Sequence, residues 1–159
     1  MNMNRFKLSD MKWLLLLLCL PLTGSCGKED LPAYDEAEIT SVGAYHRYYT
    51  TNEDELTGEN KVAEKELDKS NKIDSDAATV TSTFSIPGAG GTFTEAERSK
   101  VSLSNLVIYF NVSTAARVTP LKGAPRLGVP GDWTSEHQYS IMAANGTKKV
   151  WTVKVILNK

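Results

Sequence analysis

The side chains best suited to chemistry form one short run, Tyr45-His46-Arg47-Tyr48-Tyr49. These residues favour a strand, in which alternate side chains share a face, so Tyr45, Arg47 and Tyr49 would lie together. One face of a two-layer sandwich looks outward. Exposed aromatic rings beside a guanidinium suit carbohydrate, because rings stack on sugars and the guanidinium donates hydrogen bonds to hydroxyls. We predict a glycan site here; the alternative is an edge strand with amphipathic tyrosines and no ligand.

Two tryptophans are further candidates for stacking on a ligand. Trp133 lies in a loop, within Gly131-Asp132-Trp133, where it either closes the end of the domain or offers its ring to a sugar. Trp151 alternates with Val153 and Val155 along a strand, which predicts a core position. Trp133 therefore joins the candidate glycan site, and Trp151 does not.

Catalysis and metal binding find little support in the residue pattern. The two histidines, His46 and His137, have no second ligand at helical spacing and no spare cysteine. No Gly-Lys-Ser/Thr follows the glycine-rich stretch 88–91, and no Gly-x-Ser-x-Gly occurs. The acidic residues between 53 and 68 are most simply a solvated loop, although a pair of carboxylates needs only proximity in space. We predict a non-enzyme with neither cofactor nor metal.

The N-terminus has the anatomy of a cleaved export signal. Basic residues precede an apolar run at 13–22, which at about ten residues is too short for the roughly 20 that span a bilayer. Small residues follow at 23–25, and then Cys26. This order predicts a lipoprotein signal peptide over 1–25 and acyl chains on Cys26, which would anchor the protein to the outer membrane. Ordinary signal peptidase is the alternative, and it would leave a lone thiol.

The predicted mature chain is acidic. Removal of residues 1–25 takes away three basic residues and one acidic residue, so the net charge falls from −1 to −3. Proteins that bind nucleic acid usually carry a basic stripe, and the sequence has none. We therefore predict no nucleic-acid partner.

A short charged tether, residues 26–37, links the cysteine to the domain. Its start, Gly27-Lys28-Glu29-Asp30, resembles the surface-export signal of Bacteroidota lipoproteins, a lysine and two acids close to the acylated cysteine. The resemblance implies a protein on the outer membrane that faces the cell exterior. The alternative is a plain solvated tether, which does not exclude the periplasmic face.

Residues 38–159 are predicted to form one domain held by packing, since the mature chain has no second cysteine for a disulfide. Alternating apolar residues predict strands at 39–51, 79–86, 106–113, 138–144 and 148–157. Residues 61–67 fit a short helix or an edge strand, and 94–97 fit a helix cap. The irregular stretch 120–132 is predicted to cross between two sheets. Together these elements predict an all-β fold, an antiparallel β-sandwich.

The last two strands meet at Asn145-Gly146, a pair that favours a two-residue type I′ turn. That turn would place the apolar residues of the two strands on opposite faces, because a one-residue shift flips every side chain. Burying Trp151 and its neighbours contributes about 1.5–3 kcal/mol per side chain, more than a local turn preference. We therefore predict a three-residue loop at 144–146 with Gly146 left-handed, and Tyr139 opposite Trp151 with both inward.

The C-terminal part carries a longer pattern. Residues 117–123 read Arg-Val-Thr-Pro-Leu-Lys-Gly, 131–133 read Gly-Asp-Trp, and 139–153 contain Tyr-Ser-Ile-Met-Ala-Ala-Asn-Gly and end in Val-Trp-Thr-Val. This ending resembles small immunoglobulin-like modules of unknown function in Bacteroidota surface lipoproteins. The resemblance implies an immunoglobulin-like sandwich and a non-catalytic, glycan-binding accessory of a polysaccharide-uptake system. Because fold does not imply function, the alternative is a structural, adhesion or protein-interaction spacer.

Overall fold

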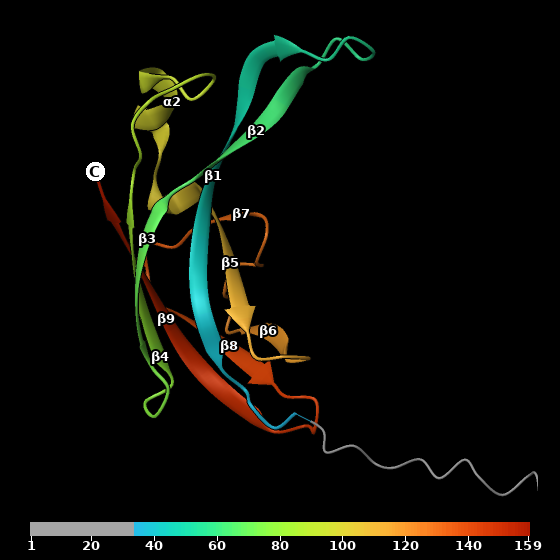
Figure 1. The fold of residues 1–159 in the computed structure, drawn as a ribbon, viewed down its shortest axis with the longest axis vertical. Coiled ribbons are helices and arrows are strands. Elements are labelled where there is room, and N and C mark those ends of the chain that lie inside the picture. Colours follow the sequence, from blue (N-terminus) through green and yellow to red (C-terminus); the bar gives the residue numbers. More distant parts are fainter. Residues whose placement is uncertain (1–33) are drawn as a thin grey trace, which may run out of the picture. The chain divides into compact units, whose positions relative to one another are not determined.

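The computed structural model describes residues 34–159, drawn in colour in Figure 1. The predicted signal peptide, Cys26 and most of the tether lie outside the described residues. Along the chain the elements are β1 (Ile39–Glu53), β2 (Asn60–Glu66), β3 (Asp68–Asp74), β4 (Thr79–Ser85), α2 (Glu95–Lys100), the short 3-10 helix η1 (Leu103–Asn105), β5 (Leu106–Val112), β6 (Arg117–Leu121), β7 (Pro130–Gly131), β8 (His137–Met142) and β9 (Lys148–Asn158).

Two sheets form a β-sandwich, which confirms the predicted all-β fold. The first, here the β1 sheet, has the strand order β2-β1-β5-β7, and the second, the β9 sheet, has the order β3-β4-β9-β8-β6. One pairing corrects the prediction: β4 and β9 run parallel, so the β9 sheet is mixed and not purely antiparallel. A parallel pair needs a long crossover, and here the chain passes through the β1 sheet between β4 and β9. The immunoglobulin-like relationship stays a prediction.

The chain changes sheets at Leu67. β2 is an edge strand of the β1 sheet, so the ambiguous segment 61–67 is a strand and not a helix. The buried Leu67 follows, its N–H donates to the Ala44 carbonyl at 3.0 Å, and β3 then runs along the edge of the β9 sheet. Sequence patterns do not reveal β3, because its half-buried residues are only Asn71 and Ile73 and the rest are exposed.

The closing hairpin has the register predicted from burial. Tyr139 lies opposite Trp151 in the β8–β9 ladder, and both side chains are fully buried. The N–H of Ala143 donates to the Thr147 carbonyl at 2.8 Å, which closes a three-residue loop. Gly146 in that loop has a φ of 90°, in the left-handed region. The prediction is therefore confirmed, and burial of the core outweighs the local turn preference.

Two predicted connections are also confirmed. Thr94 caps α2, since its hydroxyl accepts a hydrogen bond from the Glu97 N–H at 3.2 Å. The irregular stretch 120–132 begins in β6 of the β9 sheet and reaches β7 of the β1 sheet, so it crosses between the sheets. This crossing also brings the loop before β7 alongside β5, where the Gly128 N–H donates to the Ile108 carbonyl at 2.9 Å.

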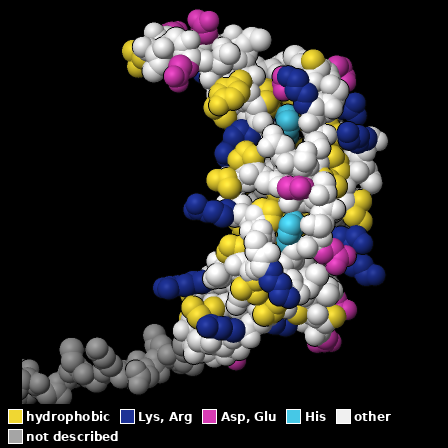
Figure 2. Space-filling model, turned by 180° about the vertical axis from the view of Figure 1, so that it is seen from behind, with side chains coloured by type: hydrophobic (Ala, Val, Ile, Leu, Met, Phe, Trp, Pro, Cys, Tyr) yellow, Lys and Arg dark blue, Asp and Glu magenta, His cyan; other side chains and the backbone are white. Residues whose placement is uncertain are grey.

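β1 is a long strand that begins where the chain enters the domain and extends beyond β5 of its sheet. The strand has 15 residues, which at about 3.3 Å each span roughly 50 Å. Its first part pairs with β5, and beyond Tyr45 it pairs with β2 alone. Residues 46–53 and β2 thus form a two-stranded ribbon whose turn lies at the opposite end from Ile39 (Figure 1). Figure 2 shows acidic side chains gathered at this tip.

Candidate functional site

The outward face of β1 carries the predicted aromatic set. Tyr49 is 72% exposed, and Tyr45 and Arg47 are half-buried on the same face. His46 and Tyr48 are buried on the opposite face. The predicted division of the run between two faces is confirmed, and it brings Tyr45, Arg47 and Tyr49 onto one surface.

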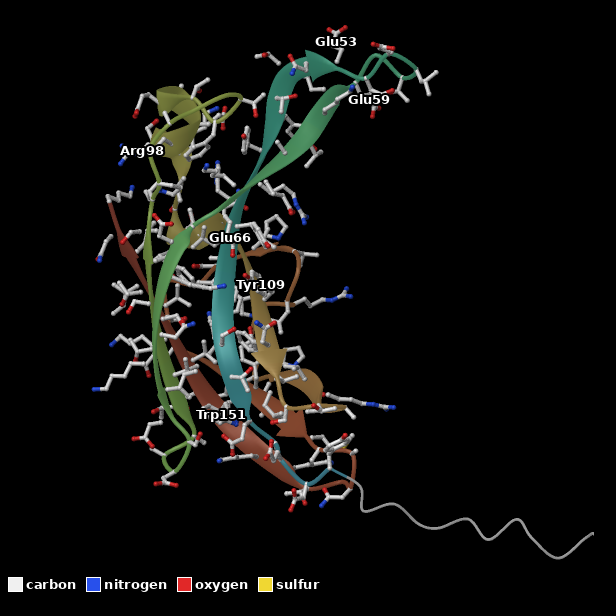
Figure 3. The ribbon with its side chains drawn as sticks, in the orientation of Figure 1. Glu53, Glu59, Glu66, Arg98, Tyr109 and Trp151 are labelled. Carbon is white, nitrogen blue, oxygen red and sulfur yellow. The ribbon has the colours of Figure 1, made fainter. Side chains whose placement is uncertain are left out.

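Tyr109 of β5 is a further aromatic residue of this surface. Its ring lies directly over β1 at Gly43, where a Cβ atom would come within 2.1 Å of Tyr109 Cζ. Beyond β1 its hydroxyl donates to Glu66 Oε1 of β2 at 2.8 Å (Figure 3). The ring of Tyr45 stacks on that of Tyr109, with centroids 5.2 Å apart and 27° between the ring planes. We call Tyr45 and Tyr109 the tyrosine platform.

The strand register explains how the platform forms. Gly43 lies opposite Tyr109 in the β1–β5 ladder, and Tyr45 lies opposite Glu66 in the β1–β2 ladder. A glycine inside a strand permits close approach, so the Tyr109 ring can cross the backbone of β1. Sequence reasoning missed Tyr109 as a site residue. The available signal was a lone glycine within a strand, together with a tyrosine on the outward face of residues 106–113.

The charged groups around the platform are paired. Arg47 Nη2 lies 2.6 Å and Nε 2.7 Å from Glu64 Oε1, and Nη2 also donates to the Gly128 carbonyl at 3.4 Å. Lys69 reaches over from β3, where its Nζ donates to the Tyr109 hydroxyl at 3.0 Å. The same Nζ lies 3.5 Å from Oε1 of Glu66, the acid that accepts from Tyr109. Each cation of this surface is therefore held against an acid.

These contacts also shift proton affinities. The neighbouring Tyr109 is the main reason that the pKa of Tyr45 lies above its ordinary value, with partial burial and Glu66 adding to the effect. The hydrogen bond with Tyr109 is the main reason that the pKa of Lys69 is raised. Both groups keep their protons at neutral pH, so the platform presents a phenol hydroxyl and an ammonium at its rim.

A shallow pocket of about 190 Å³ continues the surface beyond Arg47. Val62, which is 57% exposed, lies opposite Tyr49 on β2 and forms part of its wall. The residues that line it are Arg47, Tyr48, Tyr49, Val62, Asn105 and Pro130. Arg47 is the one charged residue of this lining. The uncharged residues around it add apolar and amide surface next to the platform.

Trp133 is not part of this surface. It is fully buried, its Nε1 donates to the Leu106 carbonyl at 3.2 Å, and its ring lies parallel to that of Tyr139 at a centroid distance of 6.1 Å. Contrary to the prediction of a glycan contact, the ring offers no face to a sugar. The physical reason is that burial of this large ring stabilises the domain while its N–H finds a carbonyl partner. Trp133 is a member of the hydrophobic core instead.

His46 lies beneath the ribbon, on the inner face of β1. Its ring stacks on Tyr48 with centroids 5.7 Å apart, and its Nε2 lies 3.8 Å from Glu97 Oε2, too far for a hydrogen bond. Burial lowers the pKa of His46 below its ordinary value, although Glu97 opposes this shift. The histidine is therefore neutral at pH 7 and packs as an aromatic residue under the ribbon.

Two negative observations apply to residues 34–159. No group of three or more His, Cys, Asp or Glu side chains in this part of the chain is placed to hold a metal ion. No helix within it has the length and apolar character needed to cross a membrane.

The fold and the surface define an all-β sandwich domain with an exposed aromatic face on one sheet. The chain belongs to the DUF5018-related family, whose sequence pattern matches residues 39–154. It is similar to a protein of Bacteroides fragilis NCTC 9343 whose crystal structure is described as that of a "putative secreted protein". The two are 71% identical over 80% of this chain and 100% of that chain, with a TM-score of 0.75. No curated protein matches the chain.

Proposed function

We propose that the chain is a non-catalytic glycan-binding module, anchored to the outer membrane through Cys26, facing the cell exterior and serving a polysaccharide-uptake system. The observation that carries the proposal is the tyrosine platform. Two stacked rings lie on the outward face of a sheet, with hydrogen-bonding groups at their rim.

The chemistry of the platform suits a sugar chain. Ring faces make apolar contact with the C–H face of a sugar ring, and stacking on an aromatic ring contributes about 0.5–1.5 kcal/mol beyond the area buried. At the rim Glu66 accepts hydrogen bonds, and Lys69 and Arg47 donate them. An enclosed pocket usually buries most of a small ligand, whereas this surface is shallow. An extended polymer laid on the sheet fits it better.

The position of the surface on β1 agrees with display away from a membrane. The chain arrives at the end of β1 that holds Ile39, and the ribbon beyond Tyr45 projects from the opposite end (Figure 1). The ribbon is therefore at the end of β1 remote from the point where the chain enters the domain. The description of the Bacteroides fragilis relative as secreted agrees with export.

A glycan panel tests the binding function. The mature chain with Cys26→Ser, which removes the acyl chains, is compared with the same chain carrying Tyr45→Ala and Tyr109→Ala. Loss of both platform rings is expected to weaken polysaccharide binding roughly tenfold or more, measured by affinity electrophoresis or calorimetry. Tyr34→Ala is the matched control, because Tyr34 is 60% exposed and lies outside the platform. It should bind as the wild type does.

Two outcomes would contradict the binding function. If the wild-type domain binds no polysaccharide of the panel, the glycan-binding function is contradicted. Binding that survives loss of both platform rings would place the site elsewhere on the domain.

Metabolic labelling with an alkyne fatty acid tests the anchor. The wild-type protein should be labelled and should partition with the outer membrane, whereas Cys26→Ser should carry no label and be released. Protease treatment of intact cells then tests orientation, since only a surface-facing domain is cleaved. An unlabelled wild type would contradict lipidation, and a protected domain would contradict display on the exterior.

A second candidate function is a spacer or adhesion subunit that contacts another protein. The observation that favours it is the ribbon, whose tip exposes 96% of Leu56 beyond any supporting strand. Single exposed apolar residues are common on protein surfaces, so this observation carries less weight than the platform. The second function is preferred if the wild-type domain binds no glycan.

A further inference from the structure

We infer that the tyrosine platform selects an uncharged polysaccharide, and that Glu64 sets this selectivity by occupying Arg47. The inference rests on the proposed glycan-binding function and names the class of its ligand.

Arg47 is the cation best placed to hold an acidic sugar, but it is already engaged. Two of its nitrogens, Nε and Nη2, converge on Glu64 Oε1 at 2.7 and 2.6 Å. The two residues lie directly opposite each other in the β1–β2 ladder, so the backbone register holds the pair together. Nη2 makes a third contact with the Gly128 carbonyl at 3.4 Å. The Nε–Nη2 edge of the guanidinium is therefore occupied, and Glu64 balances its positive charge.

Lys69 is engaged in the same way. Its Nζ lies 3.0 Å from the Tyr109 hydroxyl and 3.5 Å from Glu66 Oε1. The platform and its rim thus hold two cations and two acids, and each cation is paired with an acid. A uronate or sulfate placed on the rings would approach Glu64 and Glu66 without a free positive partner, and like charges repel.

The pocket beyond Arg47 points to the same ligand class. Apart from Arg47, its lining consists of uncharged residues: Tyr48, Tyr49, Val62, Asn105 and Pro130. The Asn105 amide, the Tyr49 phenol and the apolar surface suit hydroxyl-bearing rings that carry no charge.

Salt dependence and one substitution test the inference on the mature Cys26→Ser chain. Wild-type binding is expected to favour neutral polysaccharides over polyuronates and sulfated polymers. It should change little between about 0.1 M and about 1 M salt, where the Debye length falls from about 10 Å to about 3 Å. Glu64→Gln keeps the side-chain shape but removes the negative charge that balances Arg47. It should bind polyuronate about tenfold tighter than wild type, and high salt should abolish the gain.

Two controls isolate Arg47 as the source of that gain. Glu36→Gln removes the same charge from an exposed residue where the chain enters the domain, and it should gain nothing. Arg47→Gln combined with Glu64→Gln should lose the gain. Unfolding curves establish that each variant is folded, and the wild-type preference for neutral over acidic polymers is measured independently of all variants.

The outcomes separate the inference from the proposed function. Salt-sensitive binding of acidic polymers by the wild type would overturn the inference and leave the glycan site standing. Neutral binding with no gain in Glu64→Gln would overturn the role of Glu64. Absence of any glycan binding would contradict the proposed function and remove the inference with it.

Discussion

Replacing Trp133 with alanine is expected to lower the free energy of unfolding by about 3–5 kcal/mol. The ring is fully buried and packs against Tyr139 and His137, with centroid distances of 6.1 and 5.3 Å. Its removal leaves a cavity beside Tyr139 and His137 and deprives the Leu106 carbonyl of its Nε1–H partner. Urea or guanidinium unfolding followed by circular dichroism measures the loss.

Trp133→Phe separates packing from hydrogen bonding at this position. It keeps an aromatic ring but loses the N–H, so the expected cost is about 1–3 kcal/mol, below that of alanine. Neither variant should change glycan affinity while the domain is folded. An alanine variant as stable as wild type that no longer bound glycan would return Trp133 to the ligand site.

The faces of β1 and the closing hairpin could be predicted because both depend on burial along one or two neighbouring segments. Alternation alone places Tyr45, Arg47 and Tyr49 on one side. At the hairpin, the need to bury Tyr139 and Trp151 together fixes the register, since a loop with an even number of residues would expose one of them. Local pattern and core packing agree at these positions.

The other parts of the site and fold depend on which strands pair with each other, and the sequence pattern does not reveal this pairing. Glu66 joins Tyr109 only because β2 and β5 flank β1, and Lys69 joins them only because the chain changes sheets at Leu67. β3 is too polar to show an apolar alternation. Trp133 misleads for a related reason: its loop position suggests exposure, whereas the tertiary fold buries it. The part of the candidate site that lies on β1 could therefore be predicted from alternation within one strand. The part contributed by the neighbouring strands could not.

Gly43→Ala is expected to break the platform. The new Cβ would lie 2.1 Å from Tyr109 Cζ and 2.2 Å from its hydroxyl oxygen. Cβ atoms in proteins essentially never approach another heavy atom closer than 3.0 Å. These atoms are the far end of the side chain, so the ring would swing away and lose its contacts with Glu66 and Tyr45. The expected cost is about 1–3 kcal/mol in the free energy of unfolding. Glycan binding should fall as far as in Tyr109→Ala.

A double-mutant cycle measures this contact without any ligand. In a Tyr109→Ala background the Cβ of Gly43→Ala meets no ring, so the substitution should cost nothing or stabilise slightly. Alanine loses less backbone entropy than glycine, a difference of roughly 0.5–1 kcal/mol. The two substitutions should therefore be non-additive by about 1–3 kcal/mol. Gly88→Ala is the control, since its Cβ would meet no atom within 4 Å. Additive effects would show that Tyr109 does not rest on Gly43, and the proposed glycan surface would then lose one of its two rings.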